Sequence, residues 1–181
     1  PYAGVKLWAL PGSPTTTALG AGGWLFAAGA PAALPEGART GGVAVSPGAI
    51  SVRSGGTAMA RVAVTHPPGG APWPTLATFP GGQDAVRLSL QWAGGGAVAA
   101  ASGCPTFAVA GPPTVACESA DLPRVLLPGA TVTVDAALHA VAADGRPLPP
   151  GDYTVRLGLY QQLVGTFAGS GATTLQVRVT A

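Results

Sequence analysis

The stretch GDYTVRLGLY, residues 151–160, alternates apolar and polar side chains along its length. Val155, Leu157 and Leu159 fall on one face, and the residues between them fall on the other. The stretch TTLQVRVTA, residues 173–181, repeats the pattern. A period of two is typical of a β-strand with one buried face and one solvated face. Such strands indicate antiparallel sheets that pack as a sandwich.

The same character extends back to about residue 42, and clusters of glycine and proline separate the apolar runs as turns would. No segment shows a helical stripe of sufficient length, although a helix stays an alternative for the Ala-rich residues 136–143. The sequence therefore predicts an all-β sandwich of about seven strands. We expect these strands at 49–53, 57–65, 85–92, 97–102, 131–141, 152–160 and 173–181.

Two segments carry a resemblance to a known class of domain. SPGAISVRSGGTAMARVAVT (46–65) and PPGDYTVRLGL (149–159) resemble the opening and a late strand of bacterial and archaeal extracellular immunoglobulin-like domains. The resemblance implies an immunoglobulin-like antiparallel sandwich over residues 42–181, with insertions at 66–84 and 103–129. It also implies that the Tyr153 hydroxyl bonds back to the preceding loop, as in a tyrosine corner.

Charge is scarce in this chain. Charged residues make up 9% of the sequence, against about 25% in an ordinary globular domain, and the net charge is +2. We expect a surface so poor in charge to self-associate, and the scattered basic residues give no stripe for nucleic acid. Glycine and proline interrupt every apolar run well short of the roughly 20 residues of a membrane span, so we expect no transmembrane segment.

The two cysteines, Cys104 and Cys117, flank the segment CPTFAVAGPPTVAC. Its central Gly-Pro-Pro can turn the chain back, so the sequence predicts a disulfide between them, with two small buried thiols as the alternative. A disulfide implies an oxidising compartment, and we expect an extracellular or cell-surface protein. The chain begins at Pro1 without an initiating methionine, which we interpret as a processed chain.

Residues 1–41 differ in character from the predicted sandwich and are interpreted as an N-terminal extension. Residues 2–10 (YAGVKLWAL) form a strand-like segment with two largely apolar faces, and a linker rich in Pro, Gly, Thr and Ala follows. We expect the segment to act as a donor strand that enters a neighbouring subunit, in a head-to-tail homopolymer. Its predicted interface residues are Tyr2, Val5, Leu7, Trp8 and Leu10, with Trp24, Leu25 and Phe26 as a secondary anchor.

A catalytic or metal site is not indicated. His66 and His139 are distant from each other in sequence, Ser170 lies in a Gly-Ser-Gly turn, and no nucleophile motif is present. Glu118 and Asp121 are the nearest approach to an acidic pair, and a loop calcium site stays an alternative for them. We therefore expect no enzyme activity and no cofactor.

The tryptophans lead to different expectations. Trp92 lies on an apolar strand face and is predicted to be core, whereas Trp73, between two prolines, is predicted to be a loop anchor or a contact for a partner. The leading hypothesis is a secreted structural subunit of a filament, pilus or surface layer. The alternatives are a monomeric binding or accessory domain that contacts carbohydrate or protein through Trp73, and a proteinase inhibitor that presents the loop 66–84 or 104–117.

Overall fold

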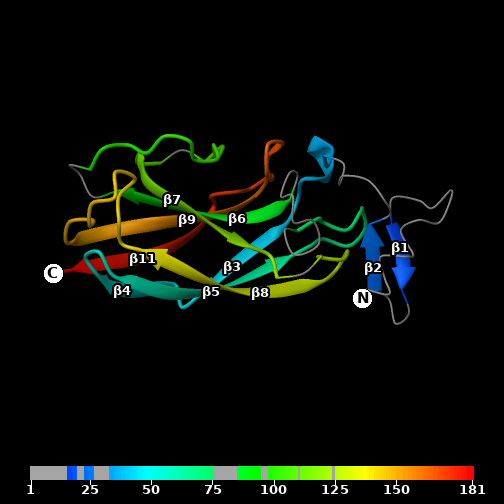
Figure 1. Cartoon of the computed structure of the whole chain (residues 1–181), viewed down its shortest axis with the longest axis horizontal. Coiled ribbons are helices and arrows are strands. Elements are labelled where there is room, and N and C mark those ends of the chain that lie inside the picture. Colours follow the sequence, from blue (N-terminus) through cyan, green and yellow to red (C-terminus); the bar gives the residue numbers. More distant parts are fainter. Residues whose placement is uncertain are drawn as a thin grey trace.

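Two β-sheets, packed face to face, form the body of the fold (Figure 1). The computed structural model describes residues 33–75, 85–94, 98–109, 111–123 and 125–181, and the backbone of 16–19 and 23–26. The strands are β1 (Thr16–Leu19), β2 (Gly23–Phe26), β3 (Gly42–Ser46), β4 (Ala49–Arg53), β5 (Thr57–Thr65), β6 (Val86–Gly94), β7 (Thr114–Asp121), β8 (Thr131–His139), β9 (Gly151–Gln161), β10 (Gly165–Thr166) and β11 (Thr173–Thr180). The only helix among the described residues is a 3-10 turn, Glu36–Ala38.

The larger sheet has the order β4-β11-β9-β6-β7, with β10 beside β9, and the smaller sheet has the order β3-β5-β8. Among the described strands, β4 and β11 run parallel and the other pairs are antiparallel. With β5 and β8 in one sheet and β6, β9 and β11 in the other, this is the strand arrangement of an immunoglobulin-like sandwich. The predicted fold class is confirmed.

The core lies between the sheets because the alternating strands direct their apolar residues inward. In β8 every second side chain is buried, and β9 and β11 follow the same rule. Trp92 of β6 is fully buried and packs edge-to-face on Tyr153, with ring centroids 6.0 Å apart. The prediction that Trp92 belongs to the core is confirmed.

Tyr153 also ties the start of β9 to the loop before it. Its hydroxyl donates a hydrogen bond to the carbonyl oxygen of Pro149 at 2.9 Å, which is the geometry of a tyrosine corner. The aromatic ring is only 2% exposed, and burial raises the pKa of the phenol above its ordinary value. The backbone-directed bond expected for this tyrosine is therefore formed.

Six of the seven predicted strands are present, and one prediction was wrong. Residues 98–102 form no strand, because a single backbone bond, from Ala101 N to Thr114 O, holds this segment where a ladder would need several. The helical alternative for 136–143 is also wrong, because β8 continues to His139. Sequence reasoning missed β1, β3, β7 and the short β10, and β7 lies within the predicted insertion 103–129.

Residues 33–41, assigned above to the N-terminal extension, pack against the sandwich. Leu34 is buried, and its N–H donates to Gln161 Oε1 at 2.8 Å. Arg39 Nη1 donates to the Leu34 carbonyl at 3.1 Å, and Thr40 forms a bridge with Ala168. The sandwich therefore begins before residue 42.

Candidate functional site

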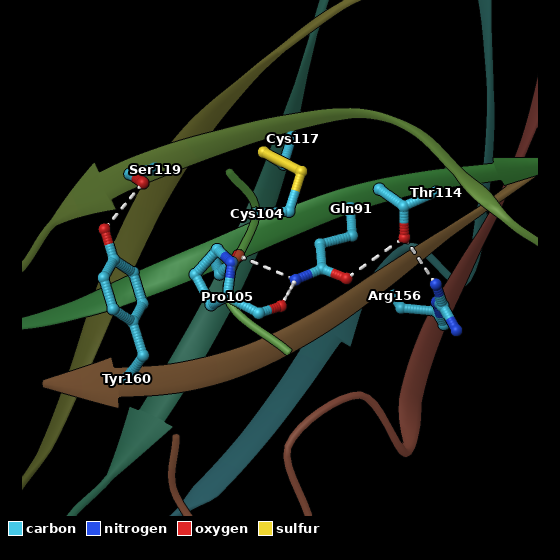
Figure 2. The surroundings of a disulfide bond; sticks show 9 residues. Gln91, Cys104, Pro105, Thr114, Cys117, Ser119, Arg156 and Tyr160 are labelled. Carbon is cyan, nitrogen blue, oxygen red and sulfur yellow. Dashed lines mark hydrogen bonds between the residues drawn. A yellow bond between two sulfur atoms is a disulfide. The ribbon is translucent and has the colours of Figure 1, made fainter. Parts of the chain in front are cut away.

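A disulfide joins the loop after β6 to strand β7 (Figure 2). Cys104 and Cys117 are bonded, with their Cα atoms 5.8 Å apart, as the sequence predicted. The loop that carries Cys104, residues 98–109, crosses the outer face of the larger sheet and lines two grooves there.

The loop buries residues that alternation alone would leave in water. Ser89 and Gln91 project from the outer face of β6, yet their exposed fractions are 1% and 2%. Phe107 of the loop packs over Gly158 and Gly171, where an added Cβ atom would lie within 2.8 Å and 2.6 Å of its ring. The larger sheet is therefore covered on both faces around β6.

A one-directional chain of hydrogen bonds runs beneath the loop (Figure 2). Arg156 Nη2 donates to Thr114 Oγ1 at 2.6 Å, and that hydroxyl donates to Gln91 Oε1 at 3.3 Å. Gln91 Nε2 donates onward to the carbonyl oxygen of Pro105. The chain begins on the Arg156 cation and ends on the Pro105 backbone carbonyl.

Comparisons of this chain with protein-family models, curated proteins and solved structures found no match.

Trp73, which the sequence suggested as a loop anchor or a partner contact, is buried in this structure. The side chain is 1% exposed, stacks on His66 with ring centroids 4.3 Å apart, and meets Phe167 edge-on. The two ring nitrogens of His66 contact the carbonyls of Pro67 and Ala71. The Trp73 side chain therefore packs inside the fold, between His66 and Phe167.

Glu118 and Asp121 lie on β7 rather than in a loop, and they do not converge. Asp121 pairs with Arg87 on the neighbouring strand at 2.7 Å. Glu118 points between the sheets, where its Oε1 accepts from Trp92 Nε1 and from the His139 backbone N–H, both at 3.0 Å. Its other oxygen contacts His139 Nδ1. This carboxylate therefore joins the edges of the two sheets.

Within the described residues, no group of three or more His, Cys, Asp and Glu side chains converges as metal ligands. No helix in the same part of the chain has the length and apolar character to cross a membrane.

The outer edge of β8 is the second functional candidate. In an antiparallel ladder, successive residues direct their backbone groups alternately toward the partner strand and away from it. The His139 N–H donates to Glu118 instead of to β5, so the odd-numbered residues of β8 direct theirs outward. These residues are Thr131, Thr133, Asp135 and Ala137, and no described strand pairs with this edge.

The predicted donor-strand residues Tyr2, Val5, Leu7, Trp8 and Leu10 lie outside the described residues. Trp24, Leu25 and Phe26 belong to β2, which pairs with β1 as an antiparallel hairpin, and only their backbone is described.

Proposed function

We propose that this chain is a non-catalytic structural module of an extracellular or cell-surface assembly. Residues 2–10 of one copy add to the β8 edge of the next, and the copies form a head-to-tail homopolymer. The interface is heterologous because donor and acceptor are different surfaces, so the assembly grows as a filament unless a rotation closes it.

The outer edge of β8 is the observation that carries this proposal. The strand has nine residues, and the apolar segment 2–10 has the same number. β8 contains no proline and no lysine, which commonly protect edge strands from pairing. Strand addition draws its affinity from backbone hydrogen bonds, and the outward N–H and C=O groups of Thr133 and Ala137 can form such bonds.

The pairing of the larger sheet supports addition at an edge of the smaller sheet. β11 already pairs with β9 and β4, so the larger sheet has its full set of strands at that position. An added strand therefore extends the smaller sheet at β8 rather than filling a gap in the core. The low charge of the chain and the Cys104–Cys117 disulfide support a self-associating protein of an oxidising compartment.

Gel filtration with negative-stain microscopy tests the proposal. We expect fibres or large oligomers from the full chain, and monomers after deletion of residues 1–12 that bind a peptide of residues 1–14. A clean monomer of the full chain, or assembly unchanged by the deletion, would contradict it.

A matched pair of variants tests the acceptor edge. Thr133→Pro removes an outward N–H without removing a ladder bond to β5, whereas Thr133→Ala keeps that N–H. We expect only the proline variant to lose assembly while its thermal stability stays close to that of the alanine variant. Equal assembly of the two folded variants would exclude β8 as the acceptor.

A further inference from the structure

We infer that the groove between the disulfide-bonded loop and the larger sheet binds a carboxylate, with Arg156 as the anchoring cation. The ligand that fits is an aspartate or glutamate side chain within an extended segment of a partner protein. The inference is independent of the β8 edge, because the groove lies on the outer face of the other sheet.

Arg156 carries a charge that lacks a carboxylate partner among the described residues. The five ion pairs of that region use the carboxylates of Glu118, Asp121, Asp135, Asp144 and Asp152, and none of these pairs includes Arg156. A guanidinium stays protonated in proteins, so its charge cannot be removed by titration. A partly buried charge of this kind favours an anion beside it.

Not every N–H group of the Arg156 guanidinium has a hydrogen-bond acceptor among the described residues. Its Nε is shielded from solvent and has no hydrogen-bond partner among the described residues. Nη2 is held by Thr114, and this bond fixes the plane of the group. Nη1 lies against the backbone at Gly111, where an added Cβ atom would come within 3.0 Å. A guanidinium held in one plane, with no carboxylate partner among the described residues, suits a carboxylate that approaches its terminal nitrogens.

The groove around Arg156 has room for one side chain with its flanking backbone. It encloses about 420 Å³, and its walls include Ala100, Pro105, Phe107 and Pro113. The polar groups on its floor are already used, because Thr114 donates to Gln91 and Gln91 donates to the Pro105 carbonyl. Apolar walls with one cation favour a carboxylate on an aliphatic stem, whereas a sugar would need several further donors and acceptors for its hydroxyls.

An NMR titration tests the inference. The probe is the peptide acetyl-Ala-Glu-Ala-amide, and its neutral control is acetyl-Ala-Gln-Ala-amide. We expect the glutamate peptide to shift the Nε–Hε signal of Arg156 and the backbone amides of Cys104, Thr106 and Thr114 in a saturable way. The glutamine peptide should cause no saturable shift.

Variants identify the anchor in the same assay. Arg156→Gln should abolish the backbone shifts, and Arg156→Lys should weaken binding about tenfold, because lysine keeps the charge but loses the fork of donors. Gly111→Ala crowds Nη1 but leaves the charge of Arg156, so it should also weaken binding of the glutamate peptide. This second test does not depend on replacing the arginine. Arg178→Gln, on the exposed side of β11, is the matched control and should bind normally.

Other ligands are included as separate titrations with glucuronate and with sulfate. A preference for either of these over the glutamate peptide would overturn the assignment to a protein carboxylate. Binding that is unchanged in a folded Arg156→Gln variant, or the absence of any saturable shift with the glutamate peptide, would overturn the site itself.

Discussion

Glu118 joins the two sheets, and its replacement by alanine should cost about 3 kcal/mol of the free energy of unfolding. Two hydrogen bonds to its Oε1 are lost, each of about 1 kcal/mol, together with the contact to His139 Nδ1. The indole N–H of Trp92 is then left buried without an acceptor, which adds a further cost of about 1 kcal/mol. Glu118→Gln keeps an acceptor for both N–H groups and should cost only about 1 kcal/mol.

Urea denaturation followed by tryptophan fluorescence measures these differences. Asp121→Ala is the control, because its carboxylate is on the same strand but half exposed, and its ion pair with Arg87 should be worth less than about 1 kcal/mol. The double variant Trp92→Phe/Glu118→Ala should lose less than the sum of its single variants, since the phenyl ring has no N–H to satisfy. A Glu118→Ala variant no less stable than Asp121→Ala would refute the role assigned to Glu118.

Three further changes test other parts of the sandwich. Tyr153→Phe removes the bond to Pro149 and should cost about 1 kcal/mol. The pKa of Tyr153 is raised in the folded state, so the unfolded chain loses the phenolic proton at a lower pH than the folded protein does. The neutral phenol therefore stabilises the fold fully below a pH of about 10, and this stabilisation declines as the pH rises further. The variant should show a shallower decline in denaturation midpoint across that range, and an identical pH profile would contradict this reasoning. Replacing both cysteines by serine should lower the free energy of unfolding by about 3 kcal/mol, because a 14-residue loop is released in the unfolded chain. The same change should raise amide exchange in residues 98–109. Protection equal to that of the wild type would show that packing alone holds the loop. Trp73→Ala should cost about 3–5 kcal/mol in chemical denaturation, and an undiminished midpoint would show that the indole does not anchor its loop.

Four of the strands that the sequence predicted have one buried face and one solvated face. β5, β8, β9 and β11 each have a buried row and a solvated row, so their alternation could be read without any tertiary information. β7 was missed because Glu118, a charged residue, occupies an inward position that an apolar residue would ordinarily fill.

The candidate sites depend on segments that lie far apart in the sequence. Arg156 occupies a solvated position in the alternating pattern of β9, and nothing near it predicts that a loop some fifty residues earlier closes over it. Trp73 has the local sequence of an exposed loop residue, and its burial depends on His66 and on Phe167, which is more than ninety residues away. The disulfide was predictable because both cysteines flank one short turn.

Residue-resolved hydrogen exchange of the β8 amides tests the central claim most directly. The outward amides of Thr131, Thr133, Asp135 and Ala137 are to be compared between the assembled full chain and the chain without residues 1–12. Strand addition at this edge predicts strong protection of these four amides in the assembly alone, while the amides of Val132 and Val134, which bond to β5, stay protected in both. Outward amides that exchange equally fast in the assembly and in the truncated monomer would contradict the account.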